Sequence, residues 1–397
     1  MKLPTGWKLS KIGQELDLLY GKPLKKQSRS GGNIPVYGSN GIVGYHSHAL
    51  VNHAGIIVGR KGSCGEIHYS QSGFFPIDTT YYVSLKHDHN LAFLFYCLRT
   101  LGLEKMNSHS AVPGLNRDVA YDVECVLPPL PEQKKIAAVL SKLQNAIDVQ
   151  DQLSQSLRDL KKSTMNHLFT HGLKGEKLKK TEIGMIPQSW EIKDATSVCA
   201  RVTDGTHDTP MPSDNGYFLI TSKNLKGGRL NLVDTYRISE QDFDEINKRS
   251  KVDIHDIIFG MIGTIGSPVR VLPDHPTIAI KNVGLFKVGG DELLGKWLCY
   301  YLGSDRTSRY FDTYGVSRTS QKYTTLGFLR SCPIPLPRKD EQVEIVHILH
   351  SIDQKLENHE SQKSAYQELF KTMLNKLMTG QIRVKNLDID TTEVDAA

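Results

Sequence analysis

Two long stretches of the chain place apolar residues at the alternating four- and three-residue spacing of a coiled-coil helix. Residues 129–170 and 335–379 align at one constant offset once Glu132-Gln133 is set on Glu341-Gln342. The alignment pairs Ile136 with Ile345, Leu140 with Leu349, Leu143 with Ile352 and Ile147 with Leu356. Each stretch is predicted to form one long helix whose apolar seam turns polar in the middle. If the two helices run antiparallel, these polar centres meet and fix the register.

The sequence ahead of each helix is duplicated as well. Trp7 and Trp190 open the two halves in similar surroundings, and AGIIVGRKGSCG (54–65) matches HDIIFGMIGTIG (255–266). We interpret each matched segment as a buried strand, a glycine turn and a returning strand. The GxxGxxG spacing lacks the Lys-Ser/Thr of a phosphate-binding loop, so the glycines are expected to serve backbone geometry. Short helices are expected at 90–101 and 292–303.

The pattern predicts an α+β protein made of two similar mixed α/β domains and two long antiparallel coiled-coil helices, related by a pseudo-two-fold internal repeat. The expected parts are a first domain (1–128), a central long helix (129–171), a link (172–188), a second domain (189–337), a distal long helix (338–380) and a C-terminal tail (381–397). Its last part, 386–397, is short, acidic and poor in apolar residues, so we expect it to be frayed.

Composition and charge narrow the class of protein. With 39% hydrophobic and 23% charged residues, the 397-residue chain has the make-up of a soluble protein. We expect a cytoplasmic location, because no secretory leader or membrane span is seen and the six cysteines form no CxxC motif. Residues 126–180 carry ten basic and five acidic residues, whereas 341–397 carry six and ten, which favours attraction between the helices.

Several phrases resemble one protein family over essentially the whole chain. They are LPPLPEQKKIAAVL (127–140), IPLPRKDEQVEIVHIL (334–349), NKLMTGQIRV (375–384), VYGSNGIVGY (36–45) and SAVPGLN (110–116). These phrases resemble the specificity subunit of type I restriction–modification systems. One departure is the RKD insertion (338–340) ahead of Glu341.

The resemblance implies that the two globular domains are target recognition domains, each reading one half of an interrupted, bipartite duplex DNA site. It implies that the helices set the gap and dock two methyltransferase (modification) subunits, which carry S-adenosylmethionine and methylate adenine. Restriction/translocase subunits would add ATP- and Mg-dependent cleavage. The chain itself is expected to bind no cofactor or metal and to be no enzyme. In agreement, the sequence contains no NPPY or DPPY tetrapeptide, FxGxG loop or GxxxxGK[ST] motif.

Candidate DNA-binding residues are basic, amide, hydroxyl and aromatic side chains in glycine-rich segments. In the first domain they are Lys22, Lys25, Lys26, Arg29, Tyr37, Ser39, Asn40, Tyr45, Arg60 and Lys61. In the second domain they are Thr203, Asp204, Thr206, His207, Lys223, Asn224, Arg318, Ser320, Gln321 and Lys322. The competing interpretation is that Ser, Asn, Asp and Gly are here turn residues.

Leucines outside the coiled-coil seam suggest a protein partner. Leu153 and Leu160 lie off the seam and would present apolar surface to a third helix. With the seam residues Leu157, Leu356, Tyr366 and Phe370 they form our candidate partner-binding set. Alternatively, the leucines widen the intramolecular seam.

Other functions stay open at this stage. The chain could serve a different bipartite-site methyltransferase or nuclease system. It could also be a coiled-coil scaffold whose domains bind protein, and this alternative predicts no binding to duplex DNA.

Overall fold

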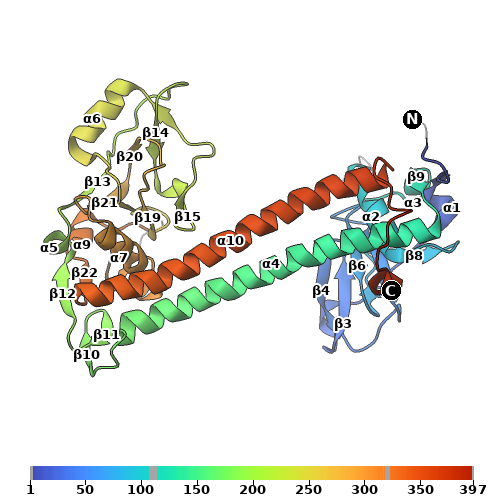
Figure 1. The fold of residues 1–397 in the computed structure, drawn as a ribbon, viewed down its shortest axis with the longest axis horizontal. Helices are drawn as coiled ribbons and strands as arrows, with labels where there is room; N and C mark the ends of the chain where they lie inside the picture. Colours follow the sequence, from blue (N-terminus) through green and yellow to red (C-terminus); the bar gives the residue numbers. More distant parts are fainter. Residues whose placement is uncertain (1–2, 107–113, 316, 318–321, 396–397) are drawn as a thin grey trace. The chain divides into compact units, whose positions relative to one another are not determined.

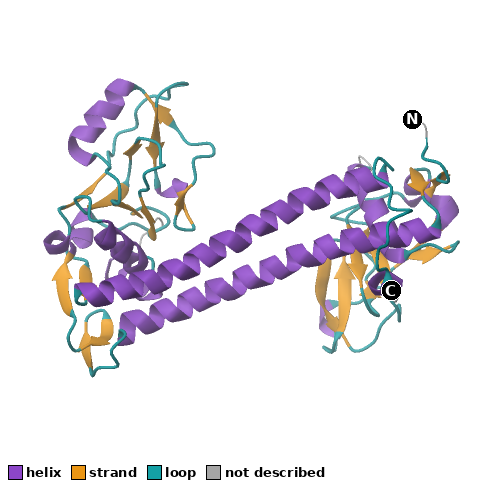
Figure 2. Ribbon diagram, in the orientation of Figure 1, coloured by secondary structure: helices purple, strands orange, loops and turns teal. Residues whose placement is uncertain are grey.

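The computed structural model describes residues 3–106, 114–315, 317 and 322–395. It contains two compact units, the first made of Met1–Gln152 and His359–Ala397 and the second of Leu153–Asn358. The two long helices, α4 (Leu130–His171) and α10 (Lys339–Met378), each contribute one part to both units (Figure 1). Figure 2 shows the strands of each unit gathered in its globular part, apart from the long helices.

The globular part of the first unit is mixed α/β, as expected. Its strands are β1 (Lys8–Lys11), β2 (Leu16–Tyr20), β3 (Ile34–Gly38), β4 (Gly41–His46), β5 (Gly55–Gly59), β6 (Ile67–Ser70), β7 (Phe75–Pro76), β8 (Thr80–Leu85) and β9 (Glu124–Leu127). Its short helices are α1 (Ile12–Glu15), α2 (Leu91–Thr100) and α3 (Arg117–Tyr121). The strands form sheets in the orders β2-β8-β5-β6, β4-β3-β7 and β1-β9.

The second unit repeats this plan. Its strands are β12 (Glu191–Asp194), β13 (Arg201–Asp204), β14 (Tyr217–Ile220), β15 (Leu225–Lys226), β16 (Arg229–Leu230), β17 (Arg237–Ile238), β18 (Ile257–Gly260), β19 (Gly266–Arg270), β20 (Ile278–Ile280), β21 (Val283–Lys287) and β22 (Pro333–Leu336). Its short helices are α5 (Ala195–Val198), α6 (Glu240–Ser250), α7 (Glu292–Leu302), α8 (Asp305–Tyr310) and α9 (Leu326–Arg330). The sheet orders β13-β21-β18-β19, β17-β14-β20 and β12-β22 match those of the first unit.

One inner strand of each four-stranded sheet, β5 or β18, explains the first glycine of the motif. β5 and β18 are buried throughout, and both end on a glycine, Gly59 or Gly260. A side chain there would overlap the carbonyl oxygen of Ser63 or Thr264 across the turn. The next two glycines of each motif have positive φ, between 74° and 98°. The motif is therefore a backbone device in both units, as predicted.

The short helices after the sheets begin where the sequence predicted. Asn90 caps α2 by accepting from the backbone N–H of Phe93, and Asp291 caps α7 by accepting from that of Leu294. Each helix packs its apolar face into the core of its unit, which also contains the matching end of the long helices.

Within each unit the two long-helix segments run antiparallel, as predicted. In the first unit, Glu132 at the start of α4 pairs with Arg383 just beyond the end of α10. In the second, Lys161 in α4 pairs with Asp353 in α10, with 2.6 Å between Nζ and Oδ1. The predicted polar layer is also present in the first unit, where His359 Nδ1 and Gln150 Oε1 lie 2.6 Å apart.

Residues 172–188, which were expected to link the two halves, contain an antiparallel hairpin. Its strands are β10 (Leu178–Thr181) and β11 (Gly184–Pro187), and it buries Ile186. The expectation that 386–397 is frayed was wrong at Val394. Val384 and Val394 are buried in the first unit's core, and Asn90 Nδ2 donates to the Val394 carbonyl at 2.8 Å. These few apolar residues suffice because they enter an existing core.

Candidate DNA interface

The basic loop after β2 carries exposed charge. Lys22, Lys25 and Lys26 are exposed, which is the placement that phosphate contacts require. Arg29 differs because it is half-buried and its Nη1 donates to the Val43 carbonyl at 2.6 Å. Arg29 therefore holds the loop against β4.

The next candidates, on β3 and β4, fall into two groups. Tyr37 is buried, with its ring edge-on to Phe74, and Ser39 is buried with its hydroxyl donating to the Thr79 carbonyl at 2.6 Å. Both are structural residues, since their polar groups are satisfied inside the unit. Asn40 and Tyr45 are exposed and remain available.

At the glycine turn, Lys61 is exposed but Arg60 is engaged. The Arg60 guanidinium donates from Nε and Nη2 to the Asp78 carbonyl and lies over the ring of Tyr20, 5.1 Å from its centroid. Arg117, at the start of α3, lies over the same ring at 5.3 Å. We did not predict Tyr20 or Arg117, because no local spacing links residues 20, 60 and 117.

In the second unit the TDGTH segment is mostly internal. Thr203 and Asp204 are buried at the end of β13. Asp204 forms an ion pair with Arg249 of α6, and its Oδ2 lies 3.2 Å from Nε2 of the exposed His207. Thr206 Oγ1 accepts from the backbone N–H of Asp208. Arg249 was not predicted, since its partner is 45 residues away.

The remaining candidates of the second unit also differ in placement. Lys223 and Lys322 are exposed, and Lys322 Nζ lies 3.9 Å from Oδ1 of Asp312. Asn224 is buried, and its amide bonds Thr221, Asn231 and Thr235, so it organises its own loop. Arg318, Ser320 and Gln321 lie outside the described residues, as does most of SAVPGLN.

The candidate partner residues separate by exposure. Leu153 and Leu160 are 40% and 50% exposed on α4. Leu157 and Leu356 are half-buried. Tyr366 packs against the core of the first unit, and Phe370 is buried in it, edge-on to Tyr96. Their apolar spacing thus reflects core packing, and only the two off-seam leucines present substantial free surface.

The glutamine of the Glu-Gln pair near the start of each long helix has the same role in both units. Gln133 Nε2 donates to the Pro128 carbonyl, and Gln342 Nε2 donates to the Pro337 carbonyl, each at 3.0 Å. Five residues separate donor and acceptor in both cases, so the side chain folds back and fixes the turn into the helix. This geometry gives the repeated glutamine a structural role in both units.

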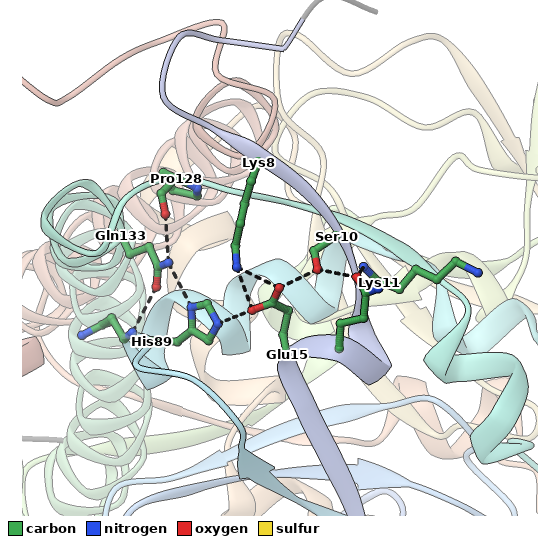
Figure 3. A network of polar contacts seen from close by, with 9 residues as sticks. Lys8, Ser10, Lys11, Glu15, His89, Pro128 and Gln133 are labelled. Atoms are coloured by element: carbon green, nitrogen blue, oxygen red, sulfur yellow. Dashed lines mark hydrogen bonds and ion pairs between the residues drawn. The ribbon is translucent and has the colours of Figure 1, made fainter.

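In the first unit Gln133 also joins a buried polar network (Figure 3). Its Nε2 lies 3.1 Å from His89 Nδ1, and His89 Nε2 lies 2.7 Å from Glu15 Oε2. Burial by itself would raise the pKa of Glu15, but hydrogen bonds from Ser10, Lys8 and His89 outweigh it. The pKa falls from its ordinary value of 4.5 to about 2. The network is a structural anchor, since its groups satisfy one another.

Two further features bear on the class of protein. Over the described part of the chain, no helix is long and apolar enough to cross a membrane. In the same residues no three His, Cys, Asp or Glu side chains gather as a metal site would require.

Comparison with known proteins finds one family at the level of both sequence and structure. The family model described as "Type I restriction modification DNA specificity domain" matches residues 4–159 and 187–365. The type I restriction enzyme MjaVIII specificity subunit of Methanocaldococcus jannaschii is 26% identical over 413 residues, covering 98% of this chain and 96% of that protein. The EcoBI specificity subunit of Escherichia coli is 24% identical over 335 residues, covering 78% and 70%.

Solved structures share the fold. The S subunit of a type I restriction–modification system from M. genitalium gives a TM-score of 0.66 at 16% identity, covering 95% of this chain and 98% of that one. A chain from a type I restriction–modification complex gives 0.55 at 15% identity, covering 96% and 100%. Since the family model spans both halves of the sequence, the chain belongs to the type I restriction–modification DNA specificity family.

Proposed function

We propose that each globular domain reads one half of an interrupted duplex DNA site. The observation that carries this proposal is the repeat: one sheet framework occurs twice, with different exposed side chains on its loops. Two copies of one framework suit two similar tasks, and their different surfaces suit two different half-sites. The exposed lysines at 22, 25, 26, 61, 223 and 322 would neutralise phosphates, which supplies affinity without sequence preference.

The long helices would set the gap between half-sites and dock two methyltransferase (modification) subunits. Leu153 and Leu160 support this role, because each exposes apolar surface on α4. The chain itself would do no chemistry. Adenine methylation would belong to the modification subunits and their S-adenosylmethionine, and cleavage to restriction/translocase subunits using ATP and Mg. A test of the spacing role inserts one heptad into each helix; the gap should change and both half-sites should stay the same.

The salt dependence of duplex binding tests the DNA role. We expect the logarithm of the affinity for a random-sequence duplex to fall linearly with the logarithm of salt concentration. Replacing Lys25 and Lys26 by Ala should reduce that slope by roughly two, about one for each lost phosphate contact. Lys355→Ala, an exposed lysine on α10, is the control and should leave the slope unchanged. A chain that binds partner protein but no duplex at low salt would favour the scaffold alternative.

A further inference from the structure

One structural position carries different chemistry in the two units. β2 ends at Tyr20 and β13 ends at Asp204, and each strand runs directly into a glycine. A side chain on Gly21 or Gly205 would overlap a backbone carbonyl, that of Ile77 or Ile280. The two glycines also form the same kind of backbone bond, to the Thr80 and Val283 carbonyls. Tyr20 and Asp204 are therefore equivalent.

In the first unit Tyr20 organises two arginines. The guanidinium of Arg60 lies 5.1 Å and that of Arg117 lies 5.3 Å from the centre of its ring. Tyr20 is 51% exposed, and its ring rests on that of the buried Tyr81 at a centroid distance of 5.1 Å. Among the described residues, the shielded Nε of Arg117 has no hydrogen-bond partner. The guanidinium of Arg117 also lies over the ring of Tyr121, 5.8 Å from its centroid, so two aromatic faces hold it.

In the second unit Asp204 organises a different pair. Its Oδ1 pairs with Arg249 and its Oδ2 with His207, whose side chains are 51% and 63% exposed. The other ring nitrogen of His207, Nδ1, lies 2.8 Å from Oδ1 of Asn282. A buried carboxylate thus holds an arginine and a histidine at the surface.

The residues around Tyr20 and Asp204 also differ between the two units. Met261 follows Gly260 where Arg60 follows Gly59, and it is buried. Leu326 begins α9 where Arg117 begins α3. Arg249 comes from α6, a helix inserted between β17 and β18 where the first unit has no described helix. The second unit therefore has no arginine at the positions of Arg60 and Arg117, and the first unit has no described helix at the position of α6.

We propose that Tyr20 and Asp204 are the positioning residues that give each recognition domain its half-site preference. Tyr20 presents Arg117 to one half-site, beside Arg60, whose Nε and Nη2 the Asp78 carbonyl holds, and Asp204 presents Arg249 and His207 to the other. This inference rests on the proposed DNA-reading function and assigns it to residues. Arginine forks pair with two acceptors on the edge of guanine, and such contacts discriminate best when the side chain is held before binding.

The test is a selection from a random duplex library. The full chain, in complex with its modification subunits, is incubated with the library, and bound DNA is sequenced. The unchanged complex should enrich one two-part motif. Tyr20→Ala should lower discrimination about tenfold or more at positions of one half-site only. Tyr20→Phe keeps the stacking ring and should restore the motif.

Asp204→Asn should alter the other half-site and leave the first intact. Because Asp204 is buried, Arg249→Ala, which removes a half-exposed side chain, must shift preference in the same half-site. Val119→Ala, on the exposed face of α3, is the matched control and should change neither.

If Tyr20→Ala and Arg249→Ala both enrich the unchanged motif, or alter the same half-site, the inference is overturned while the proposed function stands. An unchanged complex that enriches no two-part motif would overturn the proposed function, and the inference with it.

Discussion

The indole Nε1 of Trp7 donates a 3.0 Å hydrogen bond to Oε2 of Glu132, the glutamate that begins α4. Arg383, from the C-terminal tail, donates to both oxygens of the same carboxylate at 2.8 Å. Burial alone would raise the pKa of Glu132, but the bonds from Arg383 and Trp7 outweigh it and the pKa is lowered. One carboxylate thus joins the first residues, the long helix and the tail of the first unit.

Trp190, the counterpart of Trp7, provides a matched comparison. It is fully buried, but its Nε1 has no hydrogen-bond partner among the described residues; Oε1 of Glu341, the counterpart of Glu132, accepts from the Leu173 N–H. We predict that Trp7→Phe destabilises its unit by about 1–3 kcal/mol more than Trp190→Phe destabilises the other. Hydrogen exchange resolved to each unit measures both. Equal losses would show that the indole bond to Glu132 contributes nothing.

Glu15 should make the first unit sensitive to acid. Its folded pKa of about 2 lies below the ordinary 4.5, so its ionised carboxylate stabilises the folded state in full above pH 4.5. That contribution is lost as pH falls toward 2, and it is on the order of 3 kcal/mol. Glu15→Gln should therefore lower the urea midpoint at pH 7, and the difference from the unchanged chain should shrink below pH 4.5. Glu66→Gln, at an exposed site, is the control; a pH-independent difference for Glu15→Gln would contradict the account.

The glycine turn of the second unit allows the cost of a steric overlap to be measured apart from the cost of a positive φ. Gly260→Ala would force a methyl group into the Thr264 carbonyl, whereas Gly263 has positive φ but open space around it. We predict a loss of roughly 3 kcal/mol or more for Gly260→Ala and about 1 kcal/mol for Gly263→Ala, by chemical denaturation. The reverse order would mean that the positive φ of Gly263 matters more to stability than the close approach at Gly260.

The exposed leucines of α4 should matter for assembly and not for folding. Leu160→Glu places a charge at a half-exposed site, so the free energy of unfolding should change by less than about 0.5 kcal/mol. Affinity for the modification subunit should fall at least about tenfold, as for an interface residue that carries roughly 1.4 kcal/mol. Calorimetric titration against that subunit tests this, with Gln155→Glu on the same helix as control. Unchanged binding by Leu160→Glu would remove α4 from the interface at that point.

Features set by local spacing were predicted well. The heptad seam predicted both long helices, and the paired glycines predicted the turns. Helices and turns depend on residues that are near one another in sequence. Tyr37 was selected for its glycine-rich surroundings, which do not tell whether a side chain is covered; here it is buried with its ring against Phe74.

Features that depend on distant contacts escaped prediction. Tyr20, Arg60 and Arg117 meet only because β2, the glycine turn and α3 fold together, and Arg249 reaches Asp204 only through α6. The tail was judged by its own composition, although its Val384 and Val394 complete a core built by others.

The most direct test of the two-domain account is to map modified adenines by single-molecule sequencing. The chain is expressed with its modification subunit in a host that lacks adenine methylation. We predict a single interrupted motif, modified on both strands, of which one half alone changes when residues 1–128 are exchanged for another recognition domain. A continuous motif, or a change in both halves after the exchange, would contradict the claim that each domain reads its own half-site.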